Sequence, residues 1–405
     1  NMFPAQVEEV IKATDGHVVR NKATQVLDRI RKDTNEVTNP LKPVNPSKDV
    51  TVKVGGDSID GKSVYLNHTF LYRLDSSILP PDRAYQTVTD WGGTDQLNTE
   101  YDQYLGNWAV YASRDLYRDG QMLAAKGEKI AGSGFDSSKF GGNLFTVDAD
   151  DNGKVTVNAT QTYLDLVSAD NEHEAGWVLY LQCKRIAVAD EVPNTWTETI
   201  NGQPRESNKV VTKTPDMTPS IHLEKVDTPT LKQDGQEQAD RDDPKQALKM
   251  DADSIGITFI ITNTSKTDPA TGDGAWYKAS DLNLADSTIV GDAHVDMDSL
   301  AYPDNWDTLV LKPGESVSVT GTLKGVKEGD THTDRAIVTG TPLVECAPSN
   351  GDPFNDKTDG GEDTDPEYST GDVTEIDGKQ LCADTQTTSN TDDWNGYRAK
   401  PLAST

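Results

Sequence analysis

The sequence predicts an all-β protein, built as a tandem of antiparallel β-sandwiches of the immunoglobulin-like kind. Short segments rich in Val, Ile, Thr and aromatic residues recur along the chain, among them 49–54, 154–159, 177–182, 257–262 and 315–323. These compositions favour strands, and Gly, Pro, Asn and Asp bound the segments as turn residues do. Many short strands with turns between them are typical of sandwiches.

A short N-terminal helix is the exception to this pattern, and we expect it over residues 3–16. Pro4 suits a first helical turn and Gly16 can end the helix. One face of the predicted helix carries the apolar side chains of Val7, Val10 and Ile11.

Two segments rich in Pro and Thr predict the domain boundaries. Residues 38–48 and 212–220 lack many backbone donors and should form extended linkers. They leave a fragment at 1–44, a domain at 45–214 and another at 219–400. Each of the two domains is long enough to bury its own core.

Composition excludes several classes of function. The 405 residues hold 38 Lys and Arg against 67 Asp and Glu, a net charge of −29. This charge argues against a nucleic-acid partner and against docking on anionic lipid. No apolar run is long enough for a membrane span, so we expect no membrane insertion in this segment. Nucleophile-elbow, phosphate-loop, dinucleotide and zinc motifs are also missing, which argues against an enzyme.

Lys48 interrupts the polarity pattern of the strand that opens the middle domain. With a period of two residues, Lys48 falls on the face that carries Val50, Val52 and Val54. A lysine buried there must be neutralised or paired, because an isolated buried charge is strongly unfavourable. The alternative is that Lys48 ends the strand and extends its amine into water.

The middle domain, residues 45–214, resembles the last C-terminal stalk domain of the antigen I/II family of Gram-positive cell-wall-anchored adhesins. Residues 21–39 resemble the end of the stalk domain that precedes it, so 1–44 is expected to be the remnant of such a domain. The segments that carry the main resemblance are NPSKDVTV (45–52), DSIDGKSVYLNHTFLYRLDSSILPPDRA (57–84), YLGNWAVYA (104–112), YLQCKRIAV (180–188), NTWTETINGQ (194–203) and ESNKVVTKTP (206–215).

The resemblance implies an intramolecular isopeptide bond between a first-strand lysine and a last-strand asparagine. The family's motifs map these residues onto Lys48 and Asn208. A buried lysine becomes a neutral nucleophile, and a protonated carboxyl beside it polarises the amide as ammonia leaves. The reaction is autocatalytic and requires no cofactor.

The promoting acid is less well defined by the resemblance. We expect it to be Asp95, with Asp90 and Asp102 as rivals. The rivals remain because this chain departs from the family's pattern: it reads Asp-Gln-Leu-Asn at 95–98 where the family has Asp-Asp-Tyr-Asp. The alternative without a function is that all three aspartates are solvated acids in loops.

Calcium is a further expectation from the resemblance, since some family members bind it. Asn98 and Asp102 are the weak candidates for its ligands. Residues 148–153 also begin like an EF-hand loop, but Ala159 stands where the bidentate glutamate is needed. Asn152-Gly153 is better interpreted as a hairpin turn.

The last domain, 219–400, resembles an immunoglobulin-like repeat of Gram-positive surface proteins. Segments at 219–227, 258–265, 311–323 and 332–342 carry this looser similarity. Its first strand again places a lysine, Lys225, on an apolar face. A second cross-link from Lys225 to Asn390, with Asp281 as the acid, is therefore a candidate; otherwise Lys225 emerges at a strand end.

The cysteines predict one disulfide and one buried thiol. Cys183 alternates with apolar residues and should lie in a core. Cys346 and Cys382 flank the acidic stretch 349–372, which should be a long loop or hairpin insertion. In an exported protein we expect these two to be bridged.

The sequence therefore predicts a monomeric structural stalk on the extracellular surface of a bacterial cell wall. The full-length adhesin would bind a host or bacterial surface glycoprotein or polysaccharide. One alternative is that this segment is itself a recognition module that binds such ligands through its loops. Another is a carbohydrate-active enzyme module, which needs two carboxylates in an aromatic-lined cleft.

Overall fold

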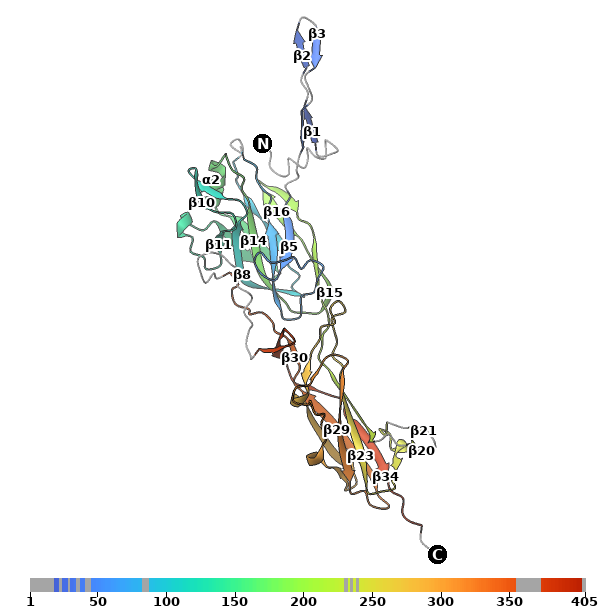
Figure 1. Ribbon diagram of the computed structural model, residues 1–405. Coiled ribbons are helices and arrows are strands. Elements are labelled where there is room, and N and C mark those ends of the chain that lie inside the picture. The colour runs from blue at the N-terminus through green and yellow to red at the C-terminus, as the bar shows by residue number, and fades with distance from the viewer. Residues whose placement is uncertain are drawn as a thin grey trace. The chain divides into compact units, whose positions relative to one another are not determined.

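The computed structural model describes residues 18–21, 24–27, 30–33, 37–40, 45–81, 87–228, 232–233, 236–237, 240–354 and 373–402. Two compact units make up the chain (Figure 1). Unit 1 holds residues 1–214 and 347–369, and unit 2 holds 215–346 and 370–405. The described residues 347–354 belong to unit 1, whereas the sequence prediction placed the whole acidic stretch within the last domain.

The N-terminal residues of unit 1 contain two strand pairs. β1 (Val18–Asn21) pairs with β4 (Val37–Pro40), and β2 (Thr24–Leu27) pairs with β3 (Ile30–Asp33). The helix predicted at 3–16 lies outside the described residues.

The main part of unit 1 consists of two five-stranded antiparallel sheets. The first has the order β11-β8-β14-β6-β5, and the second has the order β12-β13-β7-β16-β17. The first sheet contains β5 (Ser47–Thr51), β6 (Thr69–Asp75), β8 (Asp102–Ala112), β11 (Lys129–Gly132) and β14 (Trp177–Arg185). The second contains β7 (Trp91–Gln96), β12 (Phe145–Ala149), β13 (Lys154–Ala159), β16 (Trp196–Ile200) and β17 (Gln203–Glu206).

Two smaller strand pairs complete unit 1. β15 (Ala189–Asn194) pairs with β18 (Val210–Thr214), and β9 (Leu116–Arg118) pairs with β10 (Gln121–Ala124). A short 3-10 helix, η1 (Ser138–Phe140), lies between β11 and β12 in the chain.

The core of unit 1 is rich in tryptophan. Trp177 from the central strand β14 lies 6.0 Å from Trp91 and 5.8 Å from Trp196, measured between ring centroids. Trp91 and Trp196 belong to the second sheet, so these contacts hold the two sheets together. Aromatic pairs of this kind add to the stabilisation that burial of apolar area provides. Cys183 is buried and unbridged on β14, as the sequence predicts.

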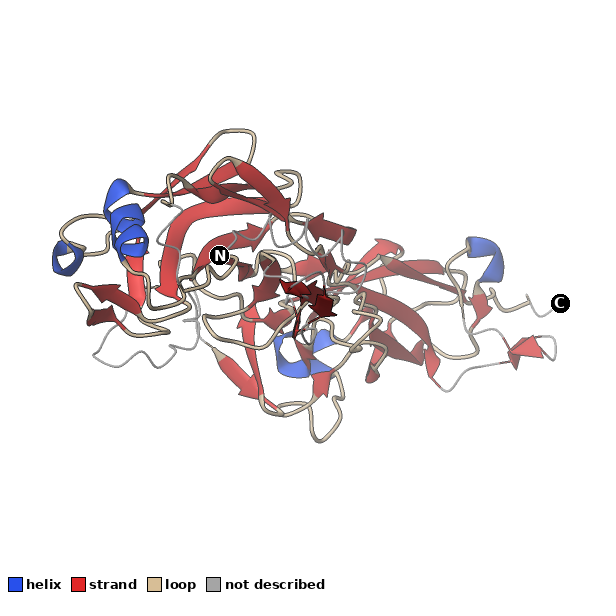
Figure 2. Ribbon diagram, turned by 90° about the horizontal axis from the view of Figure 1, so that it is seen from above, coloured by secondary structure: helices blue, strands red, loops and turns tan. Residues whose placement is uncertain are grey.

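Unit 1 contains one helix that the sequence pattern did not predict. The helix is α2 (Gln161–Ala169), one of the helices drawn in blue in Figure 2. Four of its side chains are buried: Tyr163, Leu164, Leu166 and Val167. No helix among the described residues is long and apolar enough to cross a membrane.

Unit 2 is a second sandwich. One sheet has the order β19-β23-β28-β26, and the facing sheet has the order β22-β34-β29-β25 with β33 beside β29. The first contains β19 (Ile221–Thr228), β23 (Ser254–Asn263), β26 (His294–Val295) and β28 (Ser316–Lys324). The second contains β22 (Leu248–Lys249), β25 (Asn283–Val290), β29 (Thr331–Gly340), β33 (Thr387–Thr388) and β34 (Asp392–Tyr397).

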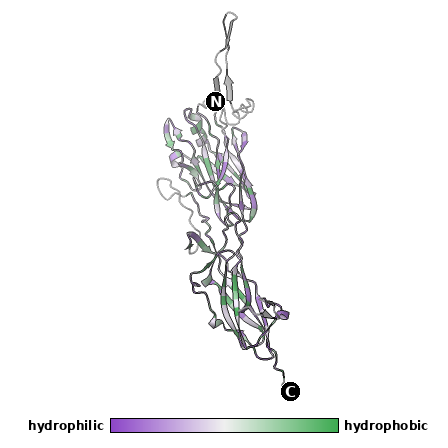
Figure 3. Ribbon diagram, turned by 45° about the vertical axis from the view of Figure 1, so that its right-hand side comes forward, coloured by the Kyte–Doolittle hydropathy of each residue, from purple (hydrophilic) through white to green (hydrophobic). Residues whose placement is uncertain are grey.

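Smaller elements border this second sandwich. Its short strand pairs and 3-10 helices are β20 (Lys232–Gln233) with β21 (Gln236–Glu237), β24 (Tyr277–Lys278) with β27 (Val310–Leu311), η2 (Pro244–Gln246), η3 (Ala279–Asp281) and η4 (Met297–Ser299). Among the named strands described, β22 and β34 form the one parallel pair. Apolar residues gather along the strands (Figure 3), and Phe259, Ile261, Val319 and Trp394 are fully buried.

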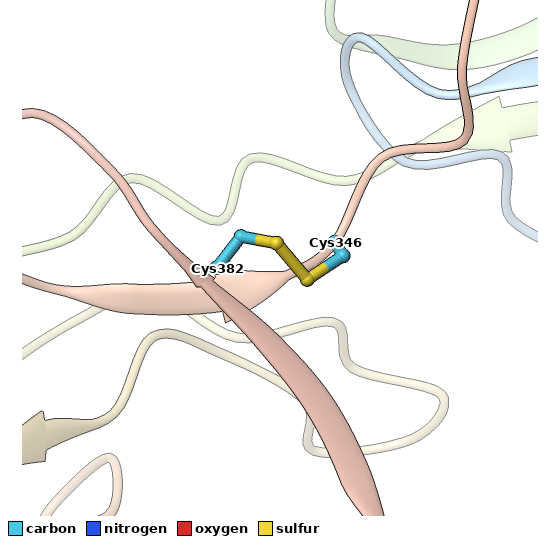
Figure 4. The surroundings of a disulfide bond; sticks show 2 residues. All are labelled: Cys346 and Cys382. Carbon is cyan, nitrogen blue, oxygen red and sulfur yellow. A yellow bond between two sulfur atoms is a disulfide. The ribbon is translucent and has the colours of Figure 1, made fainter. Parts of the chain in front are cut away.

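A disulfide closes the excursion of the chain between the two parts of unit 2. β30 (Leu343–Glu345) pairs with β32 (Lys379–Ala383), which also pairs with β31 (Thr374–Ile376). Cys346 and Cys382 are bridged there, as predicted from their positions around the acidic stretch (Figure 4).

Candidate cross-linking sites

Lys48 lies inside unit 1 rather than emerging at a strand end. Its side chain is 0% exposed, on the edge strand β5 of the first sheet. Its Nζ contacts Oδ2 of Asp95 and lies 4.5 Å from the centre of the Tyr72 ring. Asp95 belongs to β7 of the second sheet, so the contact between amine and carboxyl spans the sandwich core.

Burial shifts both groups toward their neutral forms. Desolvation lowers the pKa of Lys48, against the opposing effect of Asp95. Desolvation likewise raises the pKa of Asp95, against the opposing effects of Lys48 and Asn194. A neutral amine is a nucleophile and a protonated carboxyl is a general acid, so burial shifts the pair toward the protonation states that amide formation needs.

Asn208 meets Lys48, but not at its amine. The Asn208 side chain accepts a hydrogen bond from the main-chain N–H of Lys48 at 2.8 Å and donates one to its carbonyl at 2.9 Å. Asn208 is exposed, whereas Nζ points into the core. The contacts therefore correct the role given to Asn208: its amide is occupied by the main chain of β5 and is not presented to Nζ.

A different asparagine shares the interior with Asp95. Asn194 ends β15, is 5% exposed, and lies close enough to Asp95 to influence its pKa. Its Oδ1 and the Oδ1 of Asp95 are buried oxygens without a hydrogen-bond partner among the described residues. Such oxygens are costly unless a proton or a bond satisfies them.

The sequence carries a signal for Asn194 that the prediction of Asn208 left unused. Alternate residues from Val192 to Ile200 are buried, and Asn194 is the amide on that face. A polar residue on the apolar face of a strand is the same observation that identified Lys48.

The rival acids have other partners. Asp102 accepts hydrogen bonds from Arg185 Nε at 2.7 Å and from the Tyr72 hydroxyl at 2.7 Å, which makes it half of a buried ion pair. Asp90 accepts a hydrogen bond from the main chain of Gly202 at 3.2 Å. Of the three acids, Asp95 is the one in contact with the Lys48 amine.

The weak calcium candidates are also engaged within the protein. Asn98 Oδ1 accepts a hydrogen bond from the Glu100 N–H, and Asp102 neutralises Arg185. Asp150 accepts from the main chain of Asn152 and Lys154, which closes the predicted hairpin turn. Within the described ranges, no group of three His, Cys, Asp or Glu side chains is arranged to hold a metal.

Lys225 is buried in unit 2 with two carboxylates. Its Nζ lies 2.5 Å from Asp286 Oδ2 and 2.6 Å from Asp334 Oδ1, and the three side chains are at most 2% exposed. The predicted partners lie elsewhere. Asn390 bonds the main-chain N–H and carbonyl of Leu223, and Asp281 is exposed in η3. The proposed set of Lys225, Asn390 and Asp281 is therefore not brought together.

An open groove beside α2 is relevant to the enzyme alternative. It encloses about 500 Å³ between α2 and the β9–β10 hairpin. Its acids include Asp170, which contacts the His173 ring at 3.1 Å, and that ring stacks on Tyr117. One ring of the aromatic pair thus covers a face of the other.

Comparisons with known proteins agree with the sequence resemblance. Residues 45–215 match the family model described as cell surface antigen C-terminus. The chain is 34% identical over 209 residues to the Aggregation substance of Enterococcus faecalis, covering 51% of this chain and 15% of that protein. The chain thus corresponds to a small part of that relative's length.

Solved structures give similar matches. The C-terminal domain of the antigen I/II-family protein AspA from Streptococcus pyogenes is 28% identical, covering 48% of this chain and 54% of that chain, with a TM-score of 0.39. The C-terminal domain of the AgI/II polypeptide BspA from Streptococcus agalactiae is 23% identical, covering 48% and 58%, with a TM-score of 0.38. Residues 45–215 are thus similar to cell surface antigen C-terminal domains, in agreement with the resemblance to the antigen I/II adhesins found in the sequence.

Proposed function

We propose that this chain is a stalk segment of a surface adhesin, stiffened by a covalent cross-link in unit 1. The family is one of cell surface antigens, which places relatives of this domain outside the cell. Two sandwiches follow one another along the chain, and the first strand of each carries a buried lysine. Such a segment turns over no substrate and requires no cofactor.

The observation that carries the proposal is the buried contact between Lys48 and Asp95. We assign Asn194, in place of Asn208, as the amide that Lys48 attacks. Neutral Lys48 Nζ adds to Cγ of Asn194 while protonated Asp95 donates to the amide oxygen. Asp95 then moves a proton from Nζ to the departing nitrogen and recovers its own proton from the oxygen as the carbonyl re-forms. One C–N bond forms, one breaks, and one ammonia leaves.

Peptide mapping of the folded, full-length chain tests this assignment. Trypsin should release residues 33–53, uncut at Lys48, joined to residues 186–205 that contain Asn194, with a mass one ammonia below their sum. Bonding to Asn208 would instead join 33–53 to residues 206–209. Asn194→Ala should abolish the linked species, whereas the matched control Asn208→Ala should retain it. Unlinked peptides from the wild type would overturn the proposal.

The finer points of location and partner follow from the same proposal. A stalk of this kind would be attached to a Gram-positive cell wall and would present a distal domain to a host or bacterial surface glycoprotein or polysaccharide. It would act as a monomer. Binding of the isolated 405-residue chain to such ligands would favour the recognition-module alternative, so a glycan and glycoprotein binding screen separates the two.

A further inference from the structure

We propose that unit 2 carries a second cross-link of different chemistry: an amide between Lys225 Nζ and Asp334 Cγ, formed with loss of water. The bond would join β19 of one sheet to β29 of the facing sheet. It would replace the pairing of Lys225 with Asn390, and its assisting acid would be Asp286.

The geometry around Lys225 carries this inference. The Lys225 and Asp334 side chains are both 0% exposed, and Nζ lies 2.6 Å from Asp334 Oδ1. Despite that approach, neither carboxylate oxygen of Asp334 has a hydrogen bond of acceptable geometry among the described residues. A close but poorly aligned contact is unfavourable for a buried ion pair, whose desolvation must be offset by good hydrogen bonds. Covalent bonding removes both charges.

The amides nearby are not available for the alternative loss of ammonia. Asn390 is held by the main chain of Leu223. Asn395 accepts a hydrogen bond from Thr333 at 2.6 Å and donates one to the carbonyl of Arg241 at 2.7 Å. The carbonyl carbons that the structure offers to Nζ are those of Asp286 and Asp334.

The environments of the two aspartates assign their roles. Desolvation raises the pKa of Asp286 to about 6, so this carboxyl holds a proton more readily than an ordinary aspartate does. Desolvation opposes ionisation of Asp334 as well, but His332 and Lys225 together outweigh it and lower the pKa of that carboxyl. Asp286 therefore suits the acid, and Asp334 suits the group that receives the lysine proton and then the nucleophile.

The step balances without any added reagent. A proton passes from the Lys225 ammonium to the Asp334 carboxylate, which leaves a neutral amine beside a neutral carboxylic acid. The amine adds to Cγ, while Asp286 donates its proton toward the carbonyl oxygen. Collapse breaks the Cγ–OH bond, the hydroxyl leaves as water with a proton from Nζ, and Asp286 regains its own proton. The product is one amide and one water.

The test is a tryptic map of the reduced full-length chain. A linked species should contain residues 214–232, uncut at Lys225, joined to residues 328–335, with a mass one water below their sum. Asp286→Asn should reduce its yield at least tenfold. The exposed control Asp281→Asn should leave the yield unchanged. Asp334→Asn should give the same linked product by loss of ammonia, because the amide formed is identical.

Two results would overturn the proposal. One is cleavage at Lys225 with an unmodified peptide 328–335 in wild-type protein, which would leave an ordinary buried ion cluster. The other is a link from 214–232 to residues 279–324, which would make Asp286 the bonded residue. Neither result depends on whether a variant folds, and neither involves the peptides that report on Lys48.

Discussion

Each buried lysine meets a carboxyl from the facing sheet, and the sequence reveals only half of that arrangement. Period-two alternation places Lys48 and Lys225 on apolar faces, which the structure confirms. The partner Asp286 is harder to find in this way, because no residue of its strand, β25, is fully buried. Register between distant strands decides which acid meets which amine, and local pattern does not encode that register.

The first prediction separates the structural acid Asp102 from the reactive acid Asp95. Asp102→Asn should destabilise unit 1 by roughly 3–5 kcal/mol, because Arg185 would keep a buried charge without its counter-charge. It should still yield the linked peptides of Lys48. Asp95→Asn should remove the link instead. Urea unfolding measures the stability of both variants, and tryptic maps show whether the link is present. The prediction would be contradicted if Asp102→Asn lost the link while Asp95→Asn kept it.

The second prediction concerns Asp392, whose pKa desolvation raises to about 7. An unfolded aspartate titrates near pH 3.9, so the folded state holds the extra proton between these values. The stabilisation from that proton is present at low pH and is lost as the pH rises through about 7.

Replacing Asp392 by Asn should remove this pH dependence. Between pH 4 and pH 8 the wild type should lose about 1–2 kcal/mol relative to Asp392→Asn, a value discounted for partial solvation. Calorimetry across that range provides the measurement, with the exposed Asp281→Asn as control. Parallel melting curves for wild type and Asp392→Asn at every pH would refute the assignment.

At the scale of the element, the two units attach their last strands to their first by the same Ser-Asn device. Ser207 donates a hydrogen bond to the carbonyl of Asn208, and Ser389 does the same to Asn390. Each asparagine then pairs with the main chain of the first strand, at Lys48 or Leu223. The sequence thus predicted which asparagines contact the first strands, but not that they bond to the backbone of those strands.

The third prediction follows from this device. Asn208→Ala and Asn390→Ala should each destabilise their own unit by about 1 kcal/mol, because two hydrogen bonds are lost at a partly solvated position. Both covalent links should persist. Calorimetry of thermal unfolding measures the loss of stability. A loss well above the value for two hydrogen bonds would mean that the asparagine does more than pair with the backbone.

The helix α2 shows where element prediction failed. Its nine residues are too few for a stable isolated helix, and no side chain caps its start at Thr160. Burial of four apolar side chains against unit 1 stabilises it instead. Because that stabilisation is tertiary, the local sequence carries little signal of it.

At the scale of the whole molecule, a segment far along the chain completes unit 1. Phe354 is fully buried against Leu71, Ala109, Val178 and Tyr180 on the outer face of the first sheet. Lys129 donates a hydrogen bond to the carbonyl of Phe354 at 2.5 Å, and Gln182 donates a hydrogen bond to the carbonyl of Gly351 at 3.0 Å. The acidic composition of 349–372 predicted a long loop or hairpin insertion and gave no signal of this anchor.

The fourth prediction tests the anchor. Phe354→Ala should cost about 3 kcal/mol of docking free energy, since a fully buried aromatic ring is removed. Amides of β8 and β14 should then exchange hydrogen faster, as that face of the sheet loses its cover. Asp352→Ala, which removes only a turn contact, serves as the comparison. Unchanged exchange in Phe354→Ala would show that the ring contributes nothing to unit 1.

The disulfide also determines how far the chain can be drawn out once unit 2 has unfolded. Cys346 and Cys382 are 36 positions apart, so their bond hides about 120 Å of contour length, at the span of an extended residue. Pulling the chain by its ends should reveal that length only after a reductant is added. A bond from Lys48 to Asn194 would withhold roughly 500 Å more, and no reductant would release it. Of the contour length held back in the stretched chain, one part would thus be released by reduction and the other part would not be released at all.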